Sequence, residues 1–518
     1  MKFIELKLHS ILVESSSAEM RIMMRRYLGV LLMLQLLCVA SANAEQKINS
    51  GLMGPSTSTN PYLVPVDDSI SFVSILSAGD RVGYKKDGSP WKMVGIPDGL
   101  GAFDNADGTM TVLINHEVRE QSPGIMREHG QKGAFISRLI INKDDLKVIK
   151  AEDQIKKVIA YNSESAKYYT DDRPLYKLCS GDLSQIMGFY DPKSGLGYKG
   201  RIFLSGEEVD PNGRAFAHFV DGEKNGVSYE LAWMGNMAFE NLLAHPATGQ
   251  STVVAITEDA HKGGEVYFYV GKKQVSDNPL EQAGLAHGDL YVLKIDGLVT
   301  EGSAYDRQVL NSNNSGSFSL VKVGDVSTLT GEELDKETKK LAATVFLRPE
   351  DGAWDIVDSN RFYFNTTADF DLPSRIWALD FSDILEPEKG GIARIIYQAG
   401  KNEQHMLDNM TIAQNGEIIV QEDPGDNEYI AEILKINPRS KNSTVIKLAR
   451  HDEGIFNAKG LTTDEESSGV IDVTSIFGKS NEQLYLLTVQ AHSPFSNISD
   501  REEVIEHGQL LLMRNKSK

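Results

Sequence analysis

Six apolar, β-prone runs spread over most of the chain each end in one or two carboxylates. The runs read TVLINHE, RIFLSGEE, TVVAITED, VFLRPED, EIIVQED and LTTDEE. Their acidic residues are Glu117, Glu207, Glu208, Glu258, Asp259, Glu350, Asp351, Glu422, Asp423, Glu465 and Glu466. A single strand that ends in acid is ordinary, because strand ends commonly lie in solvated loops. A set of six predicts strand ends that converge on one cation-binding centre.

Strand-like segments dominate the rest of the sequence and indicate an all-β chain. Apolar runs such as EVYFYV, DLYVLKID, RIWALDF and QLYLLTVQ recur to the C terminus, and hairpin signals such as Asn415-Gly416 punctuate them. The acidic ends at 117, 207, 258, 350, 422 and 465 are spaced near one or two lengths of a four-stranded propeller blade, which takes about 40 to 50 residues. This favours a β-propeller with long loop insertions over a β-sandwich, because a sandwich does not naturally bring strand ends from the whole chain to one axis.

Two stretches interrupt this β pattern. Residues 118–178 are predicted to form a long polar insertion. Residues 330–341 (TGEELDKETKKL) predict a short surface helix, because Thr330 and Glu333 have the spacing of a capping box. Both stretches are expected to decorate the propeller as loops or lids.

The N terminus has the pattern of an export signal. Arg21, Arg25 and Arg26 precede an apolar stretch at 28–40, and the small-residue sequence ANA follows at 42–44. The paired arginines leave both ordinary secretion and the twin-arginine route open. We expect a periplasmic or secreted protein. Its expected parts are a signal peptide at 1–44, a leader at 45–60 and a propeller domain at 61–518.

The chain is strongly acidic, with a formal net charge of −20. Removal of 1–44, which carries five basic and three acidic residues, would bring the charge to −22. Such a charge repels nucleic acid and anionic membranes and attracts cations. No apolar run after residue 44 approaches the roughly 20 residues needed to span a bilayer. We expect a monomer with no nucleic-acid partner and no stable membrane anchor.

Cysteine usage singles out one thiol. Cleavage after Ala44 would leave Cys179, in LCSGDLS, as the only cysteine, so no internal disulfide could form. A thiolate prefers softer or borderline metals, whereas carboxylates suit calcium. Cys179 among carboxylates therefore points to a transition metal such as iron beside calcium, although a lone cysteine is also commonly a small buried apolar residue.

Local motifs narrow the enzyme class further. The sequence contains no GxSxG elbow, no HExxH and no Walker A loop, so a serine hydrolase, a zincin and a P-loop enzyme have no local support. Arg348 lies two residues before Glu350 and has a planar guanidinium that could hold a phosphate or a carboxylate. A structural ion pair is the alternative for this arginine.

Taken in order, several short motifs resemble the secreted PhoX-type alkaline phosphatases. The motifs are Asn115-His116-Glu117, Cys179-Ser180-Gly181, Gly206-Glu207-Glu208, Phe239-Glu240-Asn241 leading through His245-Pro246 to Thr257-Glu258-Asp259, and Arg348-Pro349-Glu350. The resemblance runs from about residue 60 to the C terminus. The chain fits a divergent branch, because its cysteine turn lacks the aromatic residues that are usual in the family.

The resemblance implies a propeller whose axial pocket holds iron and calcium and hydrolyses small phosphate monoesters outside the cytoplasm. By this analogy Cys179 and Glu350 are iron ligands, and Arg348 and Asn115 hold the phosphate oxygens. The other metal ligands implied are Glu117, Glu208, Glu240, Glu258 and Asp259.

Two other functions stay open from the sequence. One is a calcium-dependent hydrolase of another ester, such as a lactone, in which Arg348 would hold a carboxylate and Cys179 would be structural. The other is a non-catalytic, calcium-stabilised binding propeller. The acidic residues without an assigned role are Glu422, Asp423, Glu465 and Glu466.

Overall fold

The computed structural model describes residues 52–302, 310, 314–400, 403–440, 444–478 and 481–516. The predicted signal peptide and residues 45–51 of the predicted leader lie outside them. Strands make up most of the regular structure, and the helices are short. Across the described ranges, no helix has both the length and the apolar character needed to cross a membrane.

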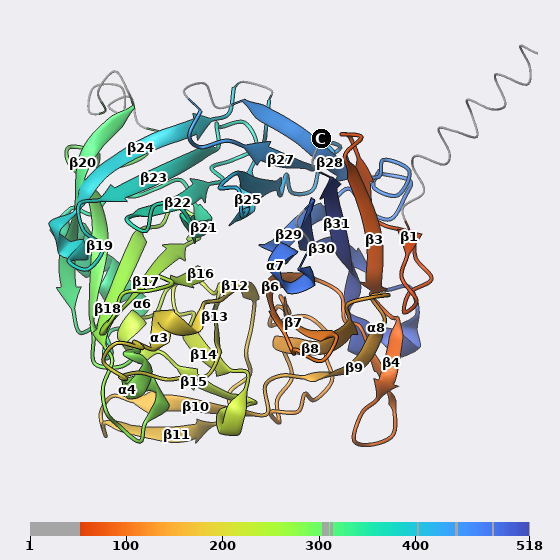
Figure 1. Ribbon diagram of the computed structural model, residues 1–518, viewed down its shortest axis with the longest axis horizontal. Helices are drawn as coiled ribbons and strands as arrows, with labels where there is room; N and C mark the ends of the chain where they lie inside the picture. The colour runs from red at the N-terminus through yellow and green to blue at the C-terminus, as the bar shows by residue number, and fades with distance from the viewer. Residues whose placement is uncertain are drawn as a thin grey trace, which may run out of the picture. The chain divides into compact units, whose positions relative to one another are not determined.

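The described strands fall into six groups around a common axis, here called blades 1 to 6 (Figure 1). From the axis outward, blade 1 consists of β6 (Pro97–Asp104), β7 (Thr109–His116), β8 (Phe135–Asn142) and β9 (Val148–Asp153). Blade 2 consists of β12 (Leu178–Leu183), β13 (Ile202–Glu207), β14 (Ala215–Phe219), β15 (Val227–Glu230), β10 (Lys157–Asn162) and β11 (Lys167–Asp171). Blade 3 consists of β16 (Phe239–Ala244), β17 (Ser251–Glu258), β18 (Val266–Lys272), β19 (Asp289–Ile295) and β20 (Ser315–Gly324).

The second half of the chain supplies the other blades. Blade 4 consists of β21 (Pro349–Trp354), β22 (Arg361–Thr366), β23 (Arg375–Phe381) and β24 (Gly391–Gln398), and β24 also pairs with β20 of blade 3. Blade 5 consists of β25 (Leu407–Ile412), β26 (Ile418–Glu422), β27 (Glu432–Ile436), β28 (Val445–His451) and β2 (Leu63–Pro65). Blade 6 consists of β29 (Glu465–Asp472), β30 (Glu482–Pro494), β31 (Glu506–Lys516), β3 (Ile70–Ser77) and β1 (Leu52–Met53).

Short elements lie between or beside the blades. The hairpin of β4 (Arg81–Tyr84) and β5 (Pro90–Lys92) contacts β9. The helices are α3 (Ile186–Phe189), α4 (Pro279–Ala283), α6 (Gly331–Leu341), α7 (Thr474–Phe477) and α8 (Ile498–Val504), with 3-10 turns η1 (Gly222–Lys224), η2 (Ala232–Met234) and η3 (Pro387–Lys389).

The innermost strands close a ring. Each contacts the innermost strand of the next blade, in the order β6, β12, β16, β21, β25, β29 and back to β6. This arrangement is a six-bladed β-propeller and confirms the predicted all-β propeller. A two-sheet sandwich is excluded, because its strands would not form a closed ring.

Six apolar clusters hold the ring together, one at each junction between neighbouring blades. Both faces of a blade therefore lie against another blade, and its middle strands are buried on both sides. This burial explains runs such as TVVAIT in β17, which are apolar at almost every position and do not alternate.

The N-terminal strands close the ring against the C-terminal ones. β3 pairs antiparallel with β31 in blade 6, and β2 pairs with β28 in blade 5. Leu52 and Met53 of β1 pair with β3, so the described fold begins inside the predicted leader.

We expect Phe72→Ala in β3 to lower the free energy of unfolding by about 3–5 kcal/mol, because it empties a buried aromatic site. Phe72 is 2% exposed and packs in the cluster between blades 5 and 6. Denaturant unfolding measures the change. Val275→Ala is the control, because Val275 is 89% exposed. It should change the free energy of unfolding by less than about 0.5 kcal/mol. An unchanged midpoint for Phe72→Ala would mean that β3 does not hold the ring shut.

The predictions for the two stretches that interrupt the β pattern of the sequence have different outcomes. The helix at 330–341 is confirmed as α6, with Thr330 and Glu333 forming the capping box. The prediction of a polar insertion at 118–178 is wrong, because this interval contains β8 and β9 of blade 1 and β10 and β11 of blade 2. The outermost of these strands, β9 and β11, carry exposed polar residues, since they lie at the outer edges of the blades.

Candidate metal centre

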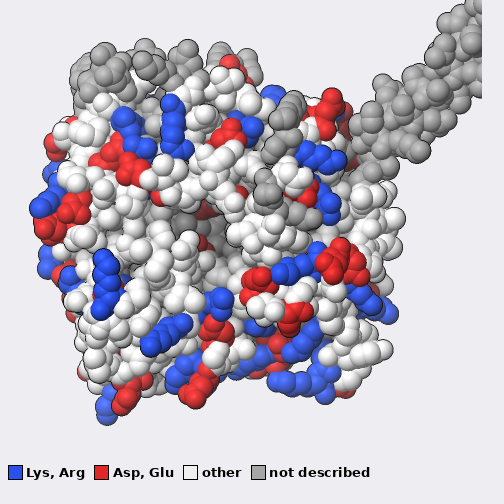
Figure 2. All heavy atoms as spheres, viewed as in Figure 1, with Lys and Arg blue, Asp and Glu red and all other residues white. Residues whose placement is uncertain are grey.

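The second residue of every innermost strand is acidic or a cysteine. We call this set the first ring: Asp98, Cys179, Glu240, Glu350, Asp408 and Glu466. In Figure 2 the surface is hollowed near the axis, and red carboxylate atoms lie inside the hollow.

Irregular pairing between the innermost and second strands sets the direction of the first-ring side chains. In five blades the register between the innermost and second strands shifts at or just after the first-ring residue, as between Pro97 and Leu100 or Pro349 and Gly352. A β-bulge re-aims the side chain of the bulged residue and is common beside functional sites. In blade 6 the register shifts further along the innermost strand, between Ser467 and Val470.

A second ring follows from the same register. In blades 1 to 5 the residue directly after the second strand donates its backbone N–H to the carbonyl of the residue before the innermost strand, and in blade 6 His492, near the end of β30, makes the same bond; the six distances are 2.9–3.1 Å. This set, the second ring, is Glu117, Glu208, Asp259, Thr367, Asp423 and His492. The paired carboxylates of the sequence are thereby separated, because only the second member of Glu207-Glu208, Glu258-Asp259 and Glu422-Asp423 takes this position.

Members of both rings form three overlapping groups of potential metal ligands. Within each group, one ligand atom from every residue lies within 4.8 Å of the others. The groups are Asp98, Glu117 and Cys179; Cys179, Glu208 and Glu240; and Glu240, Glu350 and Asp408. Adjacent groups share Cys179 or Glu240, so the ligand atoms form a continuous chain across the axis.

Burial and mutual repulsion make these carboxylates hard to ionise together. Burial, followed by the charges of neighbouring carboxylates, raises the pKa of Asp98, Glu240, Glu350 and Asp408 well above the ordinary value. The same causes raise the pKa of Glu208 to about 7, although Lys177 opposes them. Glu117 differs: burial alone would raise its pKa, but Lys177 and Arg119 more than offset it and lower the pKa. A bound cation would remove the repulsion that the other carboxylates feel.

Several buried oxygens beside the rings lack donors. Asp98 Oδ1, Asn409 Oδ1 and Gln490 Oε1 have no hydrogen-bond partner among the described residues. The amide of Gln490 donates to Asp98 Oδ2 (3.2 Å), Glu117 Oε2 (3.0 Å) and Glu466 Oε1 (3.2 Å), so it ties the two rings together. Unpaired buried oxygens are costly unless a cation takes their lone pairs. Oxygen-rich surroundings with one sulfur fit calcium together with a borderline metal such as iron.

Cys179 lies at the centre of this arrangement. It is buried, and its Sγ donates to Asp98 Oδ2 at 3.2 Å. Burial and then the charges of Asp98, Glu240 and Glu208 raise the pKa of the thiol. A free thiolate is therefore disfavoured here, and a metal ion would stabilise it.

Besides Arg119, which lies 3.9 Å from Glu117, Arg348 and Lys177 border the cluster. Arg348 binds Asp259 through Nε and Nη2, at 2.8 and 2.7 Å, and its Nη2 lies 3.3 Å from Glu350. Lys177 Nζ lies 2.6 Å from Glu208 and 3.4 Å from Glu117. Both residues directly precede an innermost strand and have left-handed backbone, with φ of 59° and 43°. Strain of this kind is common at functional sites.

The remaining predicted residues have other partners. Glu258 Oε2 accepts from the N–H of Glu265 at 3.1 Å, and its carboxylate belongs to none of the three ligand groups. Asn115 Nδ2 donates to the carbonyls of Cys179 (2.7 Å) and Ser180 (3.2 Å), so it holds the cysteine strand in place.

Of the acidic residues to which the sequence assigned no role, some lie in the rings and others have structural partners. Glu422 accepts from the backbone of His405 and Glu432 and supports the loop around them. Glu466 belongs to the first ring, as do Asp98 and Asp408, which the sequence interpretation missed. Their common signal is an acidic residue at the second position of a strand, but the preceding residues share no pattern.

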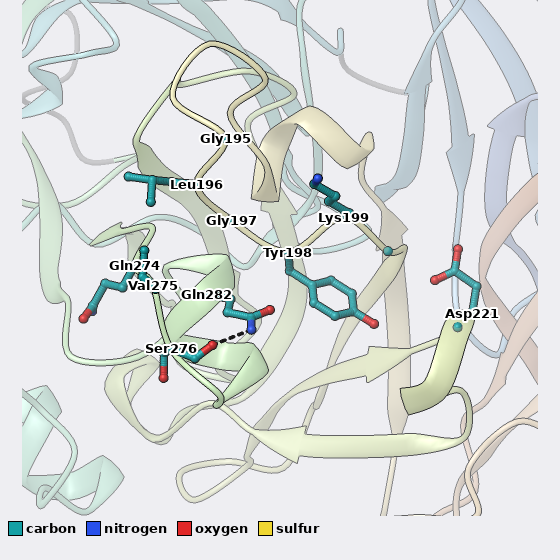
Figure 3. A pocket seen from close by; sticks show the side chains of 12 residues that line it. Gly195, Leu196, Gly197, Tyr198, Lys199, Asp221, Gln274, Val275, Ser276 and Gln282 are labelled. Carbon is teal, nitrogen blue, oxygen red and sulfur yellow. Dashed lines mark hydrogen bonds between the residues drawn. The ribbon is translucent and has the colours of Figure 1, made fainter.

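A pocket of about 630 Å³ lies away from the rings. It is lined by 195–200, Asp221 and 274–276 (Figure 3). Residues 195–200 read GLGYKG and match GxGxxG, but they lie between α3 and β13 instead of between a strand and a helix, so the context of a dinucleotide site is missing. A smaller pocket of about 310 Å³ is lined by residues of all six innermost strands, among them Asp182 and Asp351.

Comparison with known proteins agrees with this architecture. No protein-family model matches the chain, and no curated protein matches it by sequence. Among solved structures, Pseudomonas fluorescens PhoX in complex with vanadate, a transition state analogue, superposes with a TM-score of 0.63 over 90% of this chain and 98% of PhoX, at 10% identity. The chain shares the fold of PhoX.

More distant matches include two other proteins. The α-l-arabinofuranosidase Arb93A of Fusarium graminearum gives a TM-score of 0.41 at 7% identity, over 86% of this chain and 98% of that one. Trypanosoma rangeli sialidase gives 0.36 at 8% identity, over 86% of this chain and 59% of that one.

Proposed function

We propose that the chain is a metal-dependent phosphatase that hydrolyses phosphate monoesters at the axial centre. The observation that carries this proposal is the continuous chain of ligand groups, which contains one thiol and has Arg348 fixed at its edge. The shared fold with PhoX supports it, because vanadate, the compound bound to PhoX, resembles a phosphoryl group during transfer.

The two rings supply the proposed ligands. Cys179 and Glu350 would hold iron, and calcium would take the carboxylates around them. The proposed set is Asp98, Glu117, Cys179, Glu208, Glu240, Asp259, Glu350, Asp408 and Glu466. Glu258 is left out, because it belongs to neither ring and to none of the three ligand groups. When bound, iron and calcium would neutralise the charge of the phosphoryl oxygens and activate the attacking water.

Arg348 is the residue proposed to hold the substrate. Its bidentate pair with Asp259 fixes the plane of the guanidinium, and 28% of the side chain stays exposed. A fixed guanidinium stabilises charge that develops on the phosphoryl oxygens as the ester bond breaks. Asn115 would act indirectly, by positioning the strand that carries Cys179.

Export completes the proposal. A signal peptide at 1–44 would deliver a monomeric enzyme to the periplasm or the medium, where small phosphate esters are its substrates. The acidic surface would disfavour nucleic acid as a partner.

Hydrolysis of p-nitrophenyl phosphate tests the function. Purified protein is expected to release p-nitrophenol, to lose activity in a chelator, and to regain it when iron and calcium are added together. A lactone and a carboxylic ester are assayed in parallel. Turnover of either of these without any turnover of the phosphate ester would select the calcium-dependent hydrolase instead, and binding of metal without any turnover would select a binding propeller.

A further inference from the structure

Lys177 places an ammonium group inside the candidate metal centre. Its Nζ lies between Glu208 Oε2 (2.6 Å) and Glu117 Oε1 (3.4 Å), and 25% of its side chain is exposed. A lysine ammonium is charged at neutral pH in its ordinary state, and both of these contacts are with carboxylates.

The two carboxylates that Lys177 contacts belong to different ligand groups. Glu117 lies in the group with Asp98 and Cys179, and Glu208 lies in the group with Cys179 and Glu240. The lysine thus links the two groups, which also share the sulfur of Cys179.

Lys177 is one of two cationic residues among those that directly precede an innermost strand. The residues directly before the other innermost strands are Ile96, Ala238, Arg348, Met406 and Asp464. Only Arg348 is also cationic, and it binds Asp259 of the preceding blade as Lys177 binds Glu117 of the preceding blade. The guanidinium of Arg348 is committed to a bidentate pair, whereas the lysine ammonium is compact, like a bound ion.

We propose that Lys177 is a built-in cation of the metal centre and takes the place of one divalent ion between blades 1 and 2. This inference rests on the metal centre of the proposed function. An ammonium brings one positive charge and donates to carboxylates without needing any ligand to rearrange. The chain thereby limits how many divalent ions it binds on this side of the axis.

The geometry allows an ion in the same place. Two oxygens that reach one nitrogen at 2.6 and 3.4 Å need only small side-chain rotations to reach calcium, whose bonds to oxygen measure about 2.3–2.6 Å. Glu117 is buried and the side chain of Glu208 is 14% exposed, so removal of the ammonium leaves two adjacent, largely desolvated carboxylates that attract a cation, although Arg119 still lies 3.9 Å from Glu117.

Metal content of Lys177→Met tests the proposal. Wild-type protein and the variant are equilibrated with calcium, freed of unbound ions and measured by elemental analysis. Lys177→Met is expected to hold about one more calcium per chain than the wild type. Lys177→Arg keeps the charge and should hold the wild-type number. Lys156→Met is the matched control, because Lys156 pairs with Glu128 at 2.8 Å on blade 1, away from the rings.

Four outcomes would overturn the proposal. An unchanged calcium number in Lys177→Met overturns the built-in cation, and a raised KM for phosphate esters at unchanged metal content would make Lys177 a substrate-binding residue. Absence of metal from the wild type overturns this inference together with the proposed function. Amine labelling of the wild-type holoprotein covers a variant that fails to fold: Lys177 should be protected relative to Lys86, whose side chain is 84% exposed, and equal labelling overturns the proposal.

Discussion

Arg348→Met is expected to lower kcat/KM for p-nitrophenyl phosphate by about a thousandfold, because loss of one preorganised donor at a developing charge costs about 3–4 kcal/mol of transition-state stabilisation. The substitution removes the guanidinium that Asp259 holds in a fixed plane beside Glu350. Steady-state kinetics of purified, metal-loaded protein measures the loss. Arg348→Lys should recover only part of it, since an ammonium cannot donate in a fork.

Arg201→Met is the matched control for Arg348. Arg201 also pairs with an aspartate, Asp221, at 3.0 Å and is similarly exposed, but it lies on blade 2 away from both rings. Its substitution should leave kcat/KM unchanged. Wild-type activity in Arg348→Met, with metal content and melting temperature unaltered, would rule out the proposed role of Arg348.

Removal of bound metal is expected to lower the melting temperature by several degrees at pH 8. The cation would offset the repulsion among buried carboxylates of the two rings, and a ligand at about 1,000 times its Kd stabilises the native state by about 4 kcal/mol. Thermal unfolding with and without a chelator measures the shift. Chelator already saturated with calcium and iron serves as the control.

This shift should be smaller at pH 6 than at pH 8. The folded protein without metal has raised pKa values, about 7 for Glu208 and Asp423, where the unfolded chain has ordinary ones near 4. Between these limits the folded state binds more protons, so its stability without metal falls as pH rises towards and past 7. Protons thus replace the cations at low pH. A chelator effect that is larger at pH 6, or absent at both values, would contradict a cation-filled cluster.

The sequence predicted the fold class because uniformly apolar strands and acidic strand ends are properties of each blade. It also drew attention to the residues of the second ring that end long apolar runs, and it proposed roles for Glu117, Glu208 and Asp259 but none for Asp423. The sequence left open which member of each acidic pair approaches the axis. That choice depends on strand register, which is a property of pairing between strands and not of either strand alone.

The first ring was harder to predict. Asp98 and Asp408 follow Pro97 and Leu407, with no apolar run before them, and they point to the axis because β-bulges lie beside them. Bulges have no dependable local sequence signal. The prediction of a polar insertion at 118–178 was wrong for another reason. The outer strands of a blade face solvent and therefore have the composition of loops.

Elemental analysis of the purified wild-type protein beside Cys179→Ser tests the claim that the two rings hold iron together with calcium. The wild type should contain both metals, and Cys179→Ser should lose iron while it keeps calcium, because a hydroxyl is a poorer ligand than a thiolate for a borderline metal. A wild-type protein with calcium and no iron, or an iron content that Cys179→Ser leaves unchanged, would contradict the claim.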